Sequence, residues 1–165
     1  MKNRNVKSLR EIAKITKEAK KKGLKIVTTS GTFDILHIGH LRNLERAKAL
    51  GDILIVGVNS DSSVKAYKGE KRPIIGERDR VELVAGLTPV DYAFIFADPD
   101  PRPWLTKIHT DIHVKGGDWK NPDQTRAIKT IVEKPLLKEK GAKLILIDLV
   151  SGKSTSAIIE KIKKL

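Results

Sequence analysis

Short apolar runs alternate along this chain with longer segments in which apolar residues recur at helical spacing. Residues 24–29 are rich in β-branched side chains, as in a buried strand, while residues 41–50 repeat apolar side chains at helical positions and stop at Gly51. Strands are predicted on these grounds at residues 24–29, 53–58, 91–96, 112–114 and 144–147. Helices are predicted at residues 41–50, 77–87, 102–108, 125–140 (broken near Pro135) and 155–165. Repeated strand–helix units predict an α/β fold with a Rossmann-like, doubly wound parallel sheet in a single domain.

A basic helix is predicted ahead of the first strand. Ser8 and Glu11 have the spacing of a capping box, and Gly23 is a typical helix stop. Residues 1–25 hold ten Lys and Arg against two Glu, so eight of the thirteen net positive charges lie there. We therefore separate a basic N-terminal helix at residues 1–23 from a domain at residues 24–165. The helix is interpreted as docked on the domain by a narrow apolar face, with an RNA- or membrane-binding arm as the alternative.

Composition sets limits on the class of protein. A chain of 165 residues with 39% hydrophobic residues can form one domain with a substantial core. No apolar run approaches the roughly 20 residues of a membrane span, so we expect no membrane association. The sequence has no cysteine and its first ten residues lack a hydrophobic signal segment, so a cytoplasmic protein is expected.

The junction between the first strand and the next helix, residues 31–40, contains the most informative chemistry. In an open α/β sheet such a turn lies at the carboxyl end of the strand, where ligands bind. Gly39 between His37 and His40 permits a tight turn that starts the helix and aims both rings at one point, beside a helix N-terminus with free N–H groups. Three interpretations remain open from the residues alone: two structural histidines, half of a metal site with Asp34, or a phosphate-binding turn.

Three further clusters fall at predicted strand ends. Residues 61–80 hold several Lys and Arg and are either a solvated charged loop or a lid that offers cations to phosphates. Residues 115–119, Lys-Gly-Gly-Asp-Trp, are either a plain turn or a loop that binds a ribose and stacks on a base. Residues 151–156 place hydroxyls at a helix start, where they serve as caps or bind phosphate oxygens.

These segments resemble the HxGH nucleotidyltransferase superfamily, and within it the heptose 1-phosphate adenylyltransferases. The matching segments are Gly-Thr-Phe-Asp-x-Leu-His-x-Gly-His at 31–40, Val-Asn-Ser-Asp at 58–61, and those at 68–73, 115–119 and 152–156. Thr32 stands where the heptose enzymes usually have Val and is typical of glycerol-3-phosphate cytidylyltransferases. Ser156 replaces a Thr and keeps the hydroxyl. The family's sugar-kinase half is not part of this sequence, so residues 24–165 are expected to be a stand-alone nucleotidyltransferase domain of the HxGH fold.

The resemblance implies adenylyl transfer from ATP to D-glycero-D-manno-heptose 1-phosphate, giving ADP-heptose and pyrophosphate for lipopolysaccharide or cell-surface glycan precursors. The implied catalytic residues are His37, His40, Lys68 and Arg80. The implied nucleotide-binding residues are Thr32, Phe33, Gly39, Gly117, Asp118, Ser154, Thr155 and Ser156. The implied residues for the sugar phosphate are Asp34, Asn59, Asp61 and Lys115. Mg²⁺ is expected on the triphosphate, with no dedicated metal site in the protein.

Three alternatives remain. A glycerol-3-phosphate cytidylyltransferase and an FAD-synthetase-like adenylyltransferase use related chemistry, whereas a nucleic-acid-binding module would use the basic helix. The motifs at residues 58–61, 115–119 and 149–155 favour ATP and the heptose phosphate over CTP. The expected partners are a nucleotide and a sugar phosphate rather than nucleic acid, and we expect a homodimer or a higher homo-oligomer.

Overall fold

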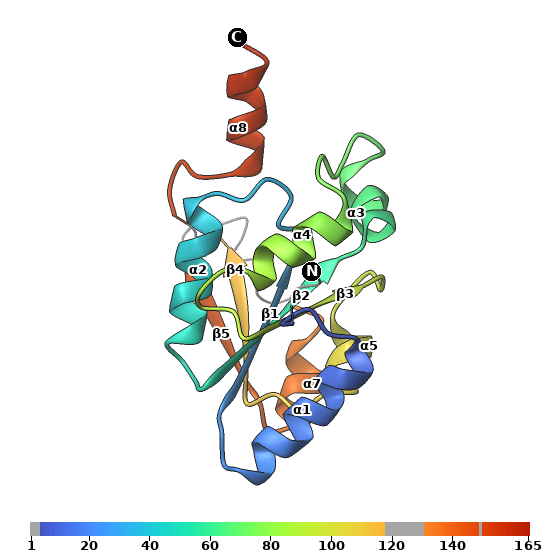
Figure 1. The fold of residues 1–165 in the computed structure, drawn as a ribbon, viewed down its shortest axis with the longest axis vertical. Coiled ribbons are helices and arrows are strands. Elements are labelled where there is room, and N and C mark those ends of the chain that lie inside the picture. Colours follow the sequence, from blue (N-terminus) through green and yellow to red (C-terminus); the bar gives the residue numbers. More distant parts are fainter. Residues whose placement is uncertain (1–3, 118–130, 149) are drawn as a thin grey trace.

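A five-stranded, all-parallel sheet forms the centre of the computed structural model, which describes residues 4–117, 131–148 and 150–165 (Figure 1). The strand order is β3-β2-β1-β4-β5. The strands are β1 (Ile26–Gly31), β2 (Ile53–Asn59), β3 (Tyr92–Phe96), β4 (Ile112–Gly117) and β5 (Lys143–Asp148). The predicted α/β fold with a Rossmann-like parallel sheet is therefore confirmed, and each predicted strand is present with its ends shifted by a few residues.

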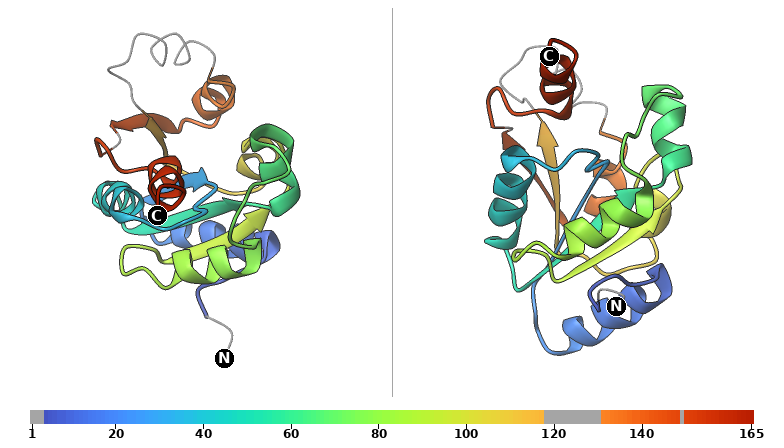
Figure 2. Two further views of the ribbon diagram at one scale, coloured as in Figure 1. Left: turned by 90° about the horizontal axis from the view of Figure 1, so that it is seen from above. Right: turned by 45° about the horizontal axis from the view of Figure 1, so that its top comes forward.

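Helices cover both faces of the sheet, as the doubly wound prediction requires. Two of them, α2 (Ile38–Lys48) and α4 (Glu77–Ala85), pack on one face. The other face carries α1 (Leu9–Lys21), α5 (Arg102–Leu105) and α7 (Lys134–Glu139). Two more, α3 (Asp61–Lys68) and α8 (Thr155–Ile162), lie toward the carboxyl ends of the strands, and α8 projects from the body (Figures 1 and 2).

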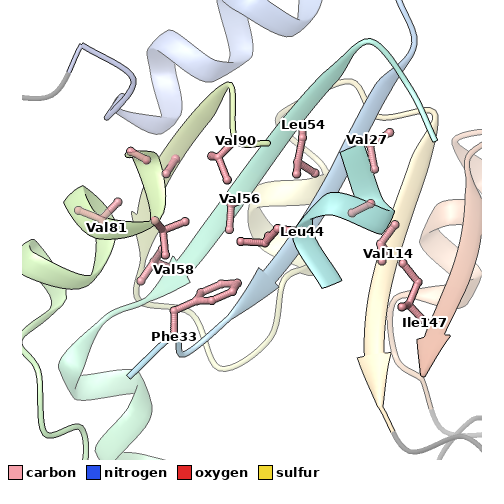
Figure 3. Packing of buried hydrophobic residues seen from close by; sticks show 14 of the residues in the cluster. Val27, Phe33, Leu44, Leu54, Val56, Val58, Val81, Val90, Val114 and Ile147 are labelled. Atoms are coloured by element: carbon pink, nitrogen blue, oxygen red, sulfur yellow. The ribbon is translucent and has the colours of Figure 1, made fainter. Parts of the chain in front are cut away.

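The alternation of side chains along the strands divides the core into two layers. On β2, Leu54, Val56 and Val58 face α2 and α4, whereas Ile55 faces the opposite layer with Phe94 of β3. Figure 3 shows the first layer, in which Leu44 of α2 and Val81 of α4 project onto these valines. Because both faces are covered, the strands are apolar on both sides and not only on alternate positions.

Local chemistry explains where the sequence-based boundaries were wrong. Residues 61–68 were predicted as part of a charged loop but form α3, because Ser60 caps the helix by accepting a hydrogen bond from the Ser63 N–H at 3.1 Å. Pro135 lies in the first turn of α7, where a missing N–H is tolerated, and does not break a longer helix there. The remainder of the predicted helix, residues 125–130, lies outside the described residues.

The N-terminal helix docks on the sheet as its apolar stripe predicted. Ser8 and Glu11 form the capping box, and Ile12, Thr16 and Ala19 are buried against the layer that contains Trp104. Just before the helix, the Lys7 N–H donates to Ala93 O at 2.9 Å, so the N-terminal segment also extends the sheet beside β3. The lysines of α1 remain on its exposed side.

The topology places the expected ligand site at the carboxyl ends of the central strands. β1 lies between β2 and β4, so the chain leaves β1 toward α2 on one side and enters β4 on the other. This is the switch point of a doubly wound sheet, and the loops at its carboxyl end diverge to leave a crevice. Among the described helices, none is both long and apolar enough to span a lipid bilayer.

Removing the central apolar contact of α1 should lower the stability of the whole domain. Ile12 is fully buried, so Ile12→Ala is expected to lower the free energy of unfolding by about 2–4 kcal/mol in urea titrations. Lys17→Ala, an exposed substitution on the same helix, should change it by less than about 0.5 kcal/mol. Equal effects of the two substitutions would contradict a docked α1.

Candidate active site

The turn after β1 has an unusual backbone that a buried aromatic ring holds in place. Phe33 has φ of 50°, in the left-handed region that residues other than glycine rarely adopt. Its ring is buried and packs beside Val58 and Leu44 (Figure 3). A Cβ at Gly31 would lie 3.1 Å from this ring, so the glycine leaves the space into which the ring folds back. Phe33, predicted as a nucleotide-binding residue, therefore shapes the turn from below.

His37 and His40 lie together at the first turn of α2. Their rings are stacked with centroids 3.9 Å apart, and the His40 ring also lies 5.3 Å from the Phe33 ring. His37 caps the helix, since its Nδ1 accepts a hydrogen bond from the Gly39 N–H at 3.1 Å. The neutral His37 ring must then carry its proton on Nε2, which makes Nε2 a hydrogen-bond donor.

Both imidazoles are held neutral at physiological pH. Burial lowers the pKa of His37 and, more strongly, lowers the pKa of His40 to about 4. The neighbouring charges of His37 and Lys68 lower the pKa of His40 further, and Asp34 opposes them. The pair therefore provides neutral donors rather than fixed cations, at the positive end of the α2 dipole.

Asp34 is occupied by the protein itself. Its carboxylate is 1% exposed and accepts hydrogen bonds from Arg72 Nε at 2.7 Å and from the N–H groups of Ile74 and Ile75 at 2.8 and 2.9 Å. We expected Asp34 to contact the sugar phosphate. The structure instead places it beneath the turn, where it ties the segment before α4 to the strand end.

Arg80 is likewise placed differently from the expectation that it meets the phosphates directly. Its side chain is fully buried, and its guanidinium donates to Ile75 O at 2.8 Å, to Asn59 O at 2.8 Å and to Thr32 O. It also forms an ion pair with Asp61 at 2.7 Å. A buried charge needs such partners, and here they come from three separate segments of the site.

Helix α3 brings cations and a hydroxyl to the same turn. Partial burial and, next, the nearby charge of Arg72 lower the pKa of Lys68. Tyr67 Oη lies 2.6 Å from Thr32 Oγ1, so the hydroxyl of Thr32 faces α3. Asn59 and Asp61 lie at the base of α3. The backbone carbonyl of Asn59 and the carboxylate of Asp61 each accept a hydrogen bond from Arg80.

The start of α8 lies beside the start of α2. A Cβ at Gly39 would be 2.9 Å from the His37 ring and 3.2 Å from Lys153 O, so only glycine fits between the two helix starts. Ser154 caps α8 by accepting from the Ala157 N–H at 3.1 Å, and Thr155 Oγ1 donates to Ile35 O at 3.4 Å. Ser156 is exposed one position further on. Two helix N-termini thus converge on one side of the predicted phosphate site.

At the end of β4 the sequence-based site is only partly visible. Gly117 is buried at the strand terminus, and Lys115 Nζ forms an ion pair with Glu133 Oε1 at 2.6 Å. Asp118, expected to bind a ribose, lies outside the described residues, as does Trp119.

Two cavities flank the carboxyl end of β1 and share Ser30 and Gly31. The smaller, about 150 Å³, lies beside α2 and the ends of β4 and β5. Its lining includes His40 and Asn43, whose Nδ1 and Oδ1 atoms are buried without a hydrogen-bond partner in the described part of the chain. The larger, about 710 Å³, lies between α3, the loop after β3 and Lys115, a volume that suits a small-molecule ligand.

No dedicated metal site is visible within the described ranges. In these residues no group of three or more His, Cys, Asp or Glu side chains is placed to hold an ion. Asp34, the carboxylate next to the histidines, has its oxygens occupied by Arg72 and two backbone N–H groups. The residues present therefore do not fit a metal bound by Asp34 and the two histidines.

A parallel sheet with paired histidines at the N-terminus of the helix after β1 is the arrangement of a nucleotide-binding transferase domain, and sequence comparison agrees. The family model for cytidylyltransferase-like proteins matches residues 28–161. The chain therefore belongs to the cytidylyltransferase-like family of nucleotidyltransferases.

Several relatives carry more specific names. The bifunctional protein HldE of Nitratiruptor sp. is 47% identical over 158 residues, which are 96% of this chain and 32% of that protein. HldE of Helicobacter pylori strain J99 is 49% identical over 140 residues, 85% of this chain and 28% of that protein. The chain thus spans about a third of the length of these relatives. The crystal structure of the lipopolysaccharide core biosynthesis protein from Thermoplasma volcanium matches with a TM-score of 0.58 at 30% identity, over 79% of this chain and all of that one.

Sequence reasoning did not single out three side chains that line the cavities. Asn43 and Tyr67 carried no signal beyond helical position. Glu133 could have been found, because it precedes Leu137 by one helical turn and so occupies a buried position where a charged residue is unusual.

Acid should weaken this fold in a window set by the histidines. Burial lowers the pKa of His40 to about 4 and that of His113 to about 3, so between pH 6.5 and 4.5 the unfolded chain binds protons that the folded chain does not. Their contribution to stability is complete above pH 6.5 and declines as the pH falls. The melting temperature should therefore drop over this window, and less steeply in His40→Gln. An identical slope in the variant would contradict the burial of His40.

Filling the gap between the two helix starts should disturb the histidine pair. Gly39→Ala places a methyl group 2.9 Å from the His37 ring, so we expect nucleotide affinity to fall about tenfold or more in calorimetric titration. Gly76→Ala is the matched control at another helix start, where the added methyl meets only Asp61 Oδ2 at 3.8 Å. Unchanged affinity in Gly39→Ala would show that ligands do not use this turn.

Proposed function

We propose that this domain transfers the adenylyl group of ATP to D-glycero-D-manno-heptose 1-phosphate, forming ADP-heptose and pyrophosphate. The observation that carries the proposal is the stacked His37–His40 pair at the N-terminus of α2, next to the start of α8. Support for the sugar comes from the motifs of the heptose enzymes and from relatives named HldE and lipopolysaccharide core biosynthesis protein. ADP-heptose would then serve as a lipopolysaccharide or cell-surface glycan precursor.

In this proposal the triphosphate lies over the two helix starts. Nε2 of His37 donates to phosphate oxygens, and the N–H groups at the start of α2 favour their charge. The hydroxyls of Thr155 and Ser156 extend the same side, while Ser154 holds α8 in place as its cap. The smaller cavity, with Asn43 and His40 Nδ1 unpaired in the described part of the chain, would receive part of the nucleoside.

The acceptor would occupy the larger cavity, on the other side of the β1 end. Lys115 lines this cavity, and Lys68 is near enough to His40 to lower its pKa. Both can neutralise the charges that accumulate as two anionic substrates approach. ATP would enter as its magnesium complex, since the histidine turn offers no carboxylate for a separate ion.

The reaction then needs positioning more than acid–base chemistry. A phosphate oxygen of the sugar 1-phosphate attacks the α-phosphorus of ATP, a new P–O bond forms, and the bond to the β-phosphate oxygen breaks as pyrophosphate leaves. The attacking oxygen is already anionic, so no general base is required. Neutral imidazole donors suit this step because they stabilise charge on the phosphoryl oxygens without exchanging protons.

Arg80 and Asp34 act in this scheme as positioning residues. Each is buried and bonded to the protein, so each fixes the turn rather than touching a phosphate. Asp61 belongs to the same set, because its carboxylate is bonded to Arg80, whereas the Asn59 side chain donates to Ser63 Oγ at 3.1 Å and only its backbone carbonyl meets Arg80. Removing these groups would displace the histidines indirectly.

The contact of Thr32 bears on the choice of nucleotide. A Thr at position 32 is the feature that this chain shares with the glycerol-3-phosphate cytidylyltransferases. Its hydroxyl, however, is hydrogen-bonded to Tyr67 Oη at 2.6 Å and faces α3. A hydroxyl used in this way does not select a base, so the main argument for CTP loses its weight. We propose ATP as the nucleotide and, because ATP is made there, the cytoplasm as the site of the reaction.

A pyrophosphate-release assay tests this function. The four nucleoside triphosphates are each offered with the heptose 1-phosphate and with glycerol 3-phosphate, and ATP with the heptose phosphate should exceed CTP by about tenfold or more in kcat/KM. His40→Ala serves as the control for contaminating activity and should lower kcat by about 10²–10³. Turnover of CTP with glycerol 3-phosphate, without turnover of ATP, would overturn the proposal.

A further inference from the structure

The larger cavity contains a buried carboxylate that is only half used. Glu133 immediately precedes α7 and is 1% exposed. Its Oε1 accepts from Lys115 Nζ at 2.6 Å, whereas Oε2 is buried and has no hydrogen-bond partner within the ranges that the structure describes. Glu133 and Lys115 both line the cavity, which reaches across to α3. The unpaired oxygen therefore lies in the wall of a ligand-sized space.

An orphaned carboxylate oxygen in such a place indicates a ligand that donates a hydrogen bond. Leaving a buried acceptor unsatisfied is unfavourable, and native proteins do so rarely. A role confined to orienting Lys115 would be fulfilled by Oε1 alone. A phosphate cannot fill the gap, because it offers no donor and carries the same charge as the carboxylate. A hydroxyl group of the ligand can donate the missing hydrogen bond to Oε2.

The rest of the cavity fits a ligand with several hydroxyls and one anionic group. The other carboxylate in the lining, Asp100, is already bonded to Arg102 at 2.9 and 2.8 Å. Across the cavity lie the small polar side chains of Ser62 and Asn59. Lys115 is 37% exposed, so its ammonium group remains available to an anion while Glu133 holds it from behind.

We infer that Glu133 determines acceptor specificity, with Oε2 accepting a hydrogen bond from a hydroxyl of the sugar while Lys115 binds the phosphate of the same molecule. This inference rests on the proposed function for the location of the acceptor, but not on the identity of the sugar. A phosphorylated polyol of any length would present the same two groups, a hydroxyl and a phosphate.

The test compares Glu133→Gln with Glu139→Gln, the same substitution at an exposed position of α7, the helix that Glu133 precedes. Steady-state kinetics give KM for the acceptor and for ATP separately. Each enzyme is then assayed with a set of acceptor phosphates that each lack one hydroxyl. The acceptor is the sugar or polyol phosphate that the wild-type enzyme turns over. If the wild type turns over none, calorimetric binding of heptose 1-phosphate and glycerol 3-phosphate replaces KM.

The inference predicts that Glu133→Gln raises KM for the acceptor about 10- to 100-fold, leaves KM for ATP within about threefold, and no longer discriminates against one of the deoxy acceptors. Glu139→Gln should match the wild type. Unchanged acceptor KM, a rise in KM for ATP instead, or full retention of the discrimination would overturn the role of Glu133. If Glu133→Gln fails to fold, Glu133→Asp is judged by the same criteria. A wild type that prefers another acceptor overturns the proposed sugar alone, so the two failures are distinguishable.

Discussion

One buried guanidinium holds together the segments at the carboxyl ends of the strands, where the candidate site lies. Arg80, on α4, donates to carbonyl oxygens after β1 and at the end of β2 and pairs with the first residue of α3. Loops at strand ends otherwise have few partners and move independently. Because a buried cation is stable only when its donors are used, Arg80 can be accommodated only when these segments are assembled. Its burial thus couples the fold of α3 and α4 to the shape of the turn.

The chemistry of the histidine pair follows from this frame. Asp34 ties the turn to the segment before α4, the Phe33 ring anchors it to the core, and Gly39 leaves room for the His37 ring. The same packing removes water from His40 and keeps its imidazole neutral. In the proposed reaction, a phosphate would be met by oriented donors at a helix terminus, with the cations on the neighbouring α3. That division would separate binding of the transferred group from neutralisation of the incoming acceptor.

Periodicity and local signals predicted the fold well, because most strands contain a short apolar run and each main helix has an apolar stripe. The turn that carries the paired histidines was also recognisable, since glycine, histidine and a helix start are adjacent in sequence. The long-range partners of these residues were not recognisable from the sequence. That Arg80 is buried depends on acceptors at Thr32 and Asn59, which no local pattern reveals. For the same reason the pairing of Thr32 with Tyr67 and of Lys115 with Glu133 emerged only from the structure.

We propose that nucleotide and acceptor lie on opposite sides of the β1 end, with the transferred phosphorus above the start of α2. A crystal structure with a non-hydrolysable ATP analogue and heptose 1-phosphate measures this arrangement directly. We predict phosphate oxygens within hydrogen-bond distance of His37 Nε2 and of the α2 N-terminus, and the sugar phosphate in the larger cavity beside Lys115. The adenosine moiety in that larger cavity, or phosphates remote from both histidines, would contradict this arrangement.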